Sequence, residues 1–463
     1  TITDANGVTQ PQSAMVIIDY HNGQIKSLIG GRNVKGKRTL NRATSPVQPG
    51  STIKPLSIYT AAIDTLEMTQ STVFSDARGG YKFKENRKWN PSTTTAGAGN
   101  MSLRLGLAKS SNTVAVKTAE NLGESYQDCI DVMMDYLKNF GITTVVDSKT
   151  NSSNTTDRSF PSLVLGGMAY GISPLEMSAA YGALANGGVY IEPTVFTTVS
   201  TYNGELIVKS TPQEHRVVDE EVAYVMTDML KAVLTEGTGS DASIGKMPVA
   251  GKTGTTNNKY CVWFVGYTPY YVGATYIGDD VGRKDSNGNK IDLRPVEGSS
   301  STTAKLWANV MKPIHENLEV VDFEKPSGIN FYKINLIDGG LSSYGSNAAF
   351  VKGTSPTRTS SYSVPTPSNT GTTQDEPTND NAGDGDNPPD DNTDNNNGDN
   401  TNDNNNNNNQ TPGGNQDDNN NGDNGNTGGG DNQDNTTPGD NGETNTGGIT
   451  DTNNATEALQ PEQ

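Results

Sequence analysis

The stretch Gln48-Pro-Gly-Ser-Thr-Ile-Lys-Pro55 decides how this chain is interpreted. Pro55 has no backbone N–H, so it fits best in the first turn of a helix, where that donor would lack a partner anyway. A Pro-Gly pair blocks an earlier start, and apolar residues follow at helical spacing, so we predict a helix from about Ser51 or Thr52. Ser51 would then lie at the positive end of the helix.

Ser51 and Lys54 form a pair that suits acyl transfer. Their spacing of three residues puts both side chains on one face of the helix. A serine hydroxyl is a weak nucleophile until a base takes its proton, and a neutral lysine amine can be that base. Burial and a nearby positive charge would lower the pKa of Lys54 and favour the neutral amine.

Two further motifs follow in the chain, Ser110-Ser-Asn112 and Lys252-Thr-Gly-Thr255. The first lies between segments with helical periodicity, whereas its copy at 152–154 lies in a polar stretch that we assign to a surface loop. A catalytic hydroxyl needs rigid support, so we take Ser110-Ser-Asn112 as the middle element of a site. Gly254, inside a predicted strand, indicates close approach by a ligand or another backbone.

The strand pattern predicts how these motifs meet. Two apolar runs flank Asn22-Gly23, the preferred pair for a tight hairpin, and three more runs occupy 249–255, 260–267 and 270–277. Helical patterns lie between them and at 306–311, where Pro313 is expected to end or kink the helix. We predict an α+β fold, with a central antiparallel sheet of about five strands flanked by helices and a mostly helical subdomain.

Acidic residues are concentrated at the C-terminal end of the chain. The formal net charge is −19 over 463 residues, but residues 359–463 hold 20 Asp and Glu and no Lys or Arg. The earlier part therefore carries 33 acids (53 − 20) against 34 bases, without a basic cluster interleaved with aromatics. A nucleic-acid partner is not expected. The Asn-, Asp- and Gly-rich tail, residues 359–463, is predicted to be disordered.

Other residue types exclude several classes of protein. Cys129 and Cys261 lie far apart, which favours buried thiols over a disulfide framework. The three histidines are scattered, so no metal site is expected. No run of about 18 apolar residues occurs, and the chain starts without a signal-like stretch. We therefore expect any membrane anchor to lie upstream.

The combination of S-x-x-K, S-x-N and K-T-G resembles the transpeptidase domain of class A (bifunctional) high-molecular-weight penicillin-binding proteins, which share this signature with serine β-lactamases. The resemblance extends to about Pro356. It includes the stretches Gly171-Ile-Ser-Pro-Leu-Glu-Met177, Ala185-Asn-Gly-Gly188, Gly237-Thr-Gly239 and Trp263-Phe-Val-Gly-Tyr-Thr-Pro269. It implies a transpeptidase domain over residues 13–325, a linker at 1–12, a C-terminal extension at 326–358 and the tail.

The resemblance also implies roles for the motif residues. Ser51 would attack the D-Ala-D-Ala end of a peptidoglycan stem peptide and become acylated, and β-lactams would acylate the same hydroxyl. Lys54 would take the proton, and Ser110 would relay it to the leaving D-alanine. The substrate-binding residues would be Asn112, Lys252, Thr253, Gly254 and Thr255, with an oxyanion hole formed by the N–H groups of Ser51 and Thr255. No cofactor is implied.

For the whole protein, the resemblance implies an upstream cytoplasmic stub, a membrane helix and a peptidoglycan glycosyltransferase domain. The transpeptidase would act at the extracytoplasmic face of a bacterial membrane, in the cell wall. Its partners would be stem peptides and β-lactam antibiotics, with cell-wall, division or elongation proteins as further candidates.

Two rivals remain open. A β-lactamase needs a carboxylate that activates water, but no Glu-x-x-Leu-Asn-like segment lies between Asn112 and Lys252, and Glu176 and Glu192 stand in structural contexts. Ser111 also stands where β-lactamases carry Asp, which favours the penicillin-binding branch. The other rival is a non-catalytic module that senses β-lactams or the wall. Cys261-Val262, where the family more often carries polar residues, leaves the role of that strand edge open.

Overall fold

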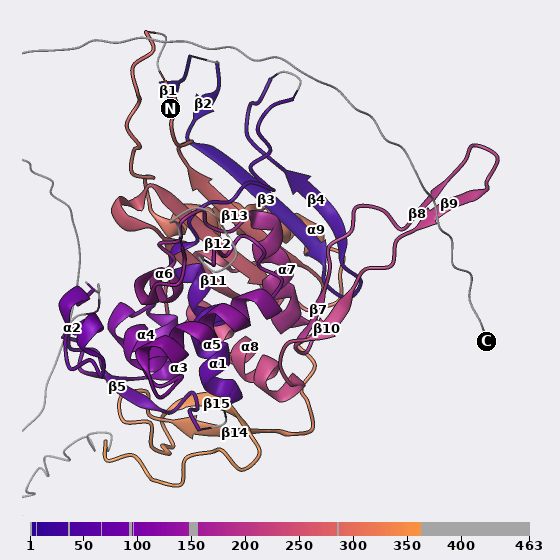
Figure 1. Cartoon of the computed structure of the whole chain (residues 1–463). Helices are drawn as coiled ribbons and strands as arrows, with labels where there is room; N and C mark the ends of the chain where they lie inside the picture. The colour runs from indigo at the N-terminus through magenta and orange to yellow at the C-terminus, as the bar shows by residue number, and fades with distance from the viewer. Residues whose placement is uncertain are drawn as a thin grey trace, which may run out of the picture. The chain divides into compact units, whose positions relative to one another are not determined.

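The structure, a computed structural model, describes residues 2–5, 7–35, 38–65, 67–91, 95, 97–147, 156–284 and 287–362. Its centre is a five-stranded sheet in the order β11-β12-β13-β3-β4 (Figure 1). All neighbouring pairs are antiparallel. The strands are β3 (Gln12–Asp19), β4 (Gln24–Ile29), β11 (Ala250–Thr255), β12 (Cys261–Tyr267) and β13 (Val272–Gly278). The predicted fold class is therefore confirmed, including the pairing of two early strands with three late ones.

Both faces of the sheet are covered. Val16 and Ile18 of β3 join the main core on one face, whereas Met15 and Ile17 join a second core formed with α9 (Ser300–His315). This alternation follows the two-residue period of a strand. Because each face is buried, β3 and β12 appear in the sequence as continuous apolar runs rather than alternating ones.

Helices cover the face of the main core. They are α1 (Thr60–Asp64), α3 (Leu103–Ala108), α4 (Asn112–Ala119), α5 (Tyr126–Asn139), α6 (Phe160–Leu165), α7 (Pro174–Ala185) and α8 (Glu220–Thr235). The predicted helix at Ser51 is present but begins as a 3₁₀ turn, η1 (Gly50–Ile53), and continues as a π-helical turn, η2 (Pro55–Tyr59), before α1. Pro55 has no N–H to donate, and the Lys54 N–H closes the first turn onto the Ser51 carbonyl.

Short elements complete the described part of the chain. Five two-stranded pairs are β1 (Ile2–Thr3) with β2 (Thr9–Gln10), β5 (Val73–Ser75) with β6 (Asn100–Ser102), β7 (Val189–Ile191) with β10 (Glu214–Arg216), β8 (Thr198–Ser200) with β9 (Leu206–Lys209), and β14 (Ile329–Ile334) with β15 (Ser346–Val351). The β8–β9 hairpin projects from the body (Figure 1). The short helical segments are α2 (Lys84–Trp89), η3 (Ser240–Ala242) and η4 (Asn257–Lys259).

The structure tests the predictions made for the cysteines, for Pro313 and for membrane-spanning helices. Cys129 and Cys261 are buried free thiols, as predicted. The helix α9 does not end at Pro313 but continues to His315, because a proline in the last turn removes only one helical hydrogen bond. The copy at 152–154 and the tail beyond Tyr362 lie outside the described residues. No helix within the described ranges is both long and apolar enough to cross a bilayer.

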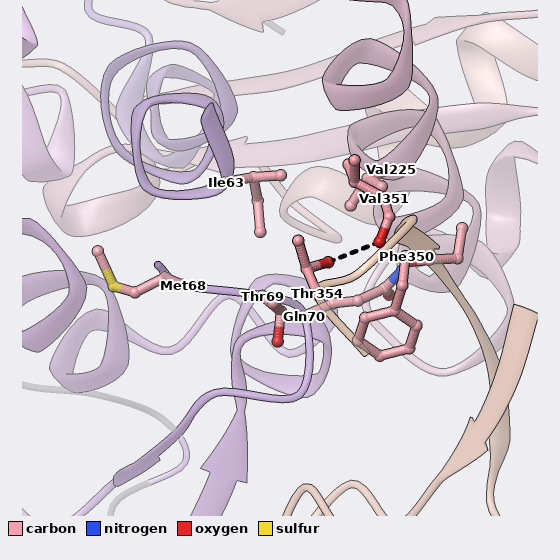
Figure 2. A pocket seen from close by; sticks show the side chains of 9 residues that line it. Ile63, Met68, Thr69, Gln70, Val225, Phe350, Val351 and Thr354 are labelled. Carbon is pink, nitrogen blue, oxygen red and sulfur yellow. Dashed lines mark hydrogen bonds between the residues drawn. The ribbon is translucent and has the colours of Figure 1, made fainter. Parts of the chain in front are cut away.

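The β14–β15 hairpin packs against α8 through a polar network. The Ala349 N–H donates to Asp228 Oδ2 at 3.0 Å, and Arg104 Nη1 donates to the same oxygen at 2.7 Å. Figure 2 shows a small cavity beside this contact, where Ile63 and Val225 face the end of β15. Its volume is about 10 Å³, room for at most about one water, so it is not a ligand site.

The strand β11 passes very close to η1, which explains Gly254. A Cβ built on Gly254 would lie 2.6 Å from the Pro49 carbonyl oxygen and 2.8 Å from Thr52 Cγ2. The close approach expected at this glycine is therefore an approach to another backbone. It brings the third motif against the first.

We expect Gly254→Ala to destabilise the fold by about 1–3 kcal/mol, because the added methyl group must push β11 away from η1. Urea denaturation measures the change. Gly167→Ala is the matched control, since a Cβ at Gly167 meets nothing within 4 Å. Equal stability of the two variants would contradict this packing.

Candidate active site

The turn that carries Ser51 is held from three sides. Trp263 Nε1 of β12 donates to the Gln48 carbonyl at 2.9 Å, and the Tyr181 hydroxyl of α7 donates to the Thr52 carbonyl at 2.7 Å. Ser57 Oγ, one turn later, donates to the Leu163 carbonyl of α6 at 2.8 Å. Ser51 is half-buried and therefore sits on a rigid support.

Lys54 is wholly buried and points at the middle motif. Its Nζ donates to Asn112 Oδ1 at 2.7 Å, to the Ser110 carbonyl at 3.0 Å and to the Ser111 carbonyl at 3.3 Å. Burial lowers the pKa of Lys54 well below its ordinary value, and the charge of Lys252 lowers it further, while Asp76 opposes the shift. These are the two causes expected from the sequence, and they favour a neutral amine.

Ser110 occupies a backbone position that usually belongs to glycine. Its φ is +58°, in the left-handed region. The Ser110 N–H bonds the Leu107 carbonyl at 3.1 Å, and the Ser111 N–H bonds the Gly106 carbonyl at 2.9 Å. This pair of bonds is the Schellman motif that ends α3. A serine in this conformation costs on the order of 1 kcal/mol of folding free energy relative to a relaxed backbone. The chain carries the Ser110 hydroxyl despite this cost.

The next two residues start α4 and face the same centre. Ser111 is its N-cap and accepts a hydrogen bond from the Val114 N–H at 3.0 Å. Asn112 is the first residue of the helix, and its amide oxygen binds Lys54. The tight junction between α3 and α4 thus explains why Ser110-Ser-Asn112 has a fixed geometry.

The third motif lies on the edge strand β11. Lys252 is wholly buried, and its Nζ donates to the Thr253 carbonyl at 3.1 Å. The Thr253 hydroxyl shares a hydrogen bond of 2.6 Å with the hydroxyl of Thr238. The Thr238 N–H in turn bonds the Ala108 carbonyl at 3.1 Å, at the end of α3. Thr238 therefore ties the third motif to the helix that leads into the second.

A cleft of about 270 Å³ opens over these elements. One residue from each motif lines it, namely Ser51, Asn112 and Thr255. Thr255 also lies directly beside the residue before Ser51, since a Cβ on Gly50 would be 3.1 Å from the Thr255 nitrogen. The remaining wall includes Gln48, Trp89, Pro161, Ser162 and Asn257.

The structure thus brings the three predicted motifs together, but not all of their residues reach the cleft. Ser51, Asn112 and Thr255 line it, Lys54 and Lys252 are buried, and Gly254 packs against η1. Ser110 ends α3, and Thr253 bonds Thr238, without lining the cleft. Sequence reasoning missed Thr238, Trp89 and Asp76. Thr238 stands in the family-like stretch Gly237-Thr-Gly239, which was a usable signal. Nothing in the polar segment around Trp89 and Asp76 marked either residue.

Lys252→Met tests the cost of burying this amine. Burial lowers the pKa of Lys252 from 10.5 to about 7, so the unfolded chain binds more protons between these values and wild-type stability rises with pH across this window. We expect Lys252→Met to be more stable than the wild type at pH 7, with an advantage that shrinks as the pH approaches 10.5. Urea denaturation at several pH values checks this, with the exposed Lys246→Met as control. An advantage that is constant across the window would contradict the burial.

Comparison with known proteins gives the family. Residues 13–290 match the sequence profile of the penicillin binding protein transpeptidase domain. Penicillin-binding protein 1A of Clostridium botulinum (strain Langeland) is 35% identical over 372 residues, which cover 76% of this chain and 42% of the relative. For penicillin-binding protein 1A of Aquifex aeolicus the identity is 32%, covering 74% and 44%. The chain thus spans about two fifths of the length of these relatives.

Solved structures agree. Penicillin-binding protein 1A from Haemophilus influenzae superposes with a TM-score of 0.63 at 26% identity, covering 77% of this chain and 56% of the other. PonA1 from Mycobacterium tuberculosis, solved in complex with penicillin V, has the same fold, with a TM-score of 0.55 at 22% identity over 70% of this chain and 83% of the other. The chain therefore belongs to the transpeptidase domains of the class A penicillin-binding proteins.

Proposed function

We propose that this protein is a serine D,D-transpeptidase that cross-links peptidoglycan stem peptides through an acyl-enzyme on Ser51. The observation that carries the proposal is the buried Lys54 amine, bonded to Asn112 and to two carbonyls of the middle motif beneath the cleft that Ser51 lines. A depressed lysine pKa beside a positioned serine is the arrangement that activates a hydroxyl.

In the proposed reaction, Ser51 Oγ attacks the carbonyl carbon of the penultimate D-alanine, and its proton passes to the neutral amine of Lys54. A neutral amine donates only two hydrogens, so the longest of its three contacts, to the Ser111 carbonyl at 3.3 Å, is the one released. The tetrahedral oxyanion is held by the N–H groups of Ser51 and Thr255. When the C–N bond breaks, the proton returns through the Ser110 hydroxyl to the leaving D-alanine.

The second half of the reaction mirrors the first. An amine of a neighbouring stem attacks the acyl-enzyme, its proton passes to Lys54, and Ser51 leaves with a proton restored. Asn112 holds the acyl chain, while Lys252, Thr253 and Thr255 bind the terminal carboxylate beside Gly254. A carboxylate entering beside Lys252 would favour the ammonium form of that amine.

A β-lactamase is the less favoured reading. None of the described residues that line the cleft carries a carboxylate. Glu176 is engaged in the capping box of α7, where it accepts from the Ser173 N–H at 3.0 Å and from the Thr143 N–H at 2.9 Å. These contacts support the structural context that the sequence indicated for Glu176. An acyl-enzyme without a base for water persists long enough to meet an amine.

We extend the proposal to the whole protein. The transpeptidase domain comprises residues 13–325, preceded by a linker at 1–12 and followed by an extension at 326–358 and a spacer tail at 359–463. Since the chain spans about two fifths of its relatives, we propose a glycosyltransferase domain and a membrane anchor upstream. The site then faces the cell wall on the extracytoplasmic side of the membrane, where stem peptides and β-lactams reach it.

Benzylpenicillin tests the nucleophile. We expect intact mass to show one stable penicilloyl adduct, and peptide mapping to place it on Ser51, because this hydroxyl lines the cleft above Lys54. The Ser51→Ala variant should show no adduct and no release of D-alanine from stem peptides. Rapid turnover of nitrocefin would favour the β-lactamase, and a wild-type adduct without any release of D-alanine would favour the non-catalytic module. Cross-linking that survives Ser51→Ala would contradict the acyl-enzyme on Ser51.

Ser110→Gly separates function from stability. Glycine adopts the left-handed backbone without steric cost, so we expect the melting temperature to stay unchanged or to rise. The rate of D-alanine release should fall by about 10²–10⁴, because the relay hydroxyl is gone. Asn33→Gly, which relieves a positive φ of +50° elsewhere, should leave that rate unchanged. Full activity of Ser110→Gly would remove Ser110 from the mechanism.

A further inference from the structure

Asp76 is a buried carboxylate that the proposed reaction does not use. It follows β5, is fully shielded from solvent, and its N–H bonds the Gly99 carbonyl at 2.8 Å. Its Oδ1 accepts a short hydrogen bond from the Ser111 hydroxyl, whereas Oδ2 has no hydrogen-bond partner among the described residues. Burying a carboxylate is costly, so its retention calls for a reason.

The partner of Asp76 is the middle residue of the second motif. The Ser111 hydroxyl donates to Asp76 while it accepts from the Val114 N–H, so Asp76 fixes the N-cap of α4. In the β-lactamase form of the signature this position is itself an aspartate. Here the carboxylate comes from a segment about 35 residues earlier and reaches the motif through the serine hydroxyl.

The charges around Asp76 connect it to the reacting amine. Asp76 faces Lys54, Lys117 of α4 and the phenol of Tyr59. Lys117 Nζ bonds the carbonyls on both sides of Asp76, that of Ser75 at 2.7 Å and that of Ala77 at 3.0 Å. Lys54 in turn faces Lys252 from β11 and Asp76. Asp76 is thus the one negative charge among the groups that shift the pKa of Lys54.

We propose that Asp76 is a positioning residue of the acyl-transfer site. Through Ser111 it holds the backbone segment whose Ser110 and Ser111 carbonyls face Lys54, and its charge lies among the groups that act on that amine. This inference rests on the proposed roles of Ser51 and Lys54.

The charge and the hydrogen bond can be separated. Asp76→Asn keeps an oxygen that accepts from Ser111 and removes the negative charge. That charge favours the ammonium form of Lys54 and so raises its pKa, against the lowering by burial and by Lys252. Without it, the pKa of Lys54 falls further, and the neutral amine forms at lower pH. Ser111→Ala does the opposite, since it breaks the hydrogen bond and keeps the charge.

The experiment is the rate of acylation by a fluorescent penicillin, measured over about pH 5 to 9 on the full chain. For Asp76→Asn we expect the acid limb of the profile to move to lower pH by on the order of one unit. For Ser111→Ala we expect the limb to stay and the plateau rate to fall about tenfold, because the carbonyls on Lys54 lose their support. The control is Asp64→Asn, which should change neither. Asp64 also accepts a short hydroxyl hydrogen bond, from Tyr136, but it does not act on Lys54.

The outcomes of the experiment distinguish the positioning role of Asp76 from a purely structural one. An unshifted limb in Asp76→Asn, with or without a lower plateau, would reduce Asp76 to a structural residue and overturn the inference. If Asp76→Asn does not fold, a Ser111→Ala plateau equal to that of the wild type overturns it, and a reduced plateau supports it. A wild-type chain that forms no adduct on Ser51 would instead refute the proposed function, because no acylation profile would then exist.

Discussion

Lys54 and Lys252 are both wholly buried, the charge of Lys252 acts on Lys54, and neither amine has a carboxylate in hydrogen-bond contact in the described part of the chain. Removing an ammonium from water costs several kcal/mol, so such a pair persists only where the surrounding packing forces it. The close passage of β11 over η1 provides that force, because Gly254 lets the two backbones touch. The acyl-transfer chemistry that we propose depends on this burial, since it lowers the pKa of Lys54 and so favours the neutral amine.

The packing explains which parts of the site could be predicted from the sequence. Ser51, Lys54, Lys252 and the five strands follow local patterns of spacing and apolar periodicity, and each was placed correctly in the fold. The left-handed backbone conformation of Ser110 could not be predicted from the sequence, because it depends on the junction of two helices. The π-helical turn after Lys54 likewise has no signal in the local pattern, and α9 continues past Pro313 because a proline in the last turn removes only one helical hydrogen bond.

Long-range polar contacts were the least predictable part. Asp76 and Thr238 reach the motifs from segments without periodicity or charge clustering, and single hydrogen bonds leave no trace in local composition. Membership of the penicillin-binding transpeptidase family accounts for the motifs and the fold. The contacts of Asp76 and Thr238 with the motifs can be identified only from the three-dimensional structure.

Arg104 links α3 to α8 through a buried polar network that also reaches the C-terminal hairpin. This buried side chain lies on α3, which runs into Ser110, and it bonds Asp228 and Glu236 of the α8 region. Asp228 also holds the β15 strand of the C-terminal hairpin. Opening the hairpin would break the Ala349 N–H bond to Asp228, although Arg104 would keep both of its carboxylate partners, so fraying at this end costs a buried hydrogen bond. The C-terminal hairpin and the helix that leads into Ser110 therefore share one buried carboxylate, which ties the last described strands to the helix beside the candidate site.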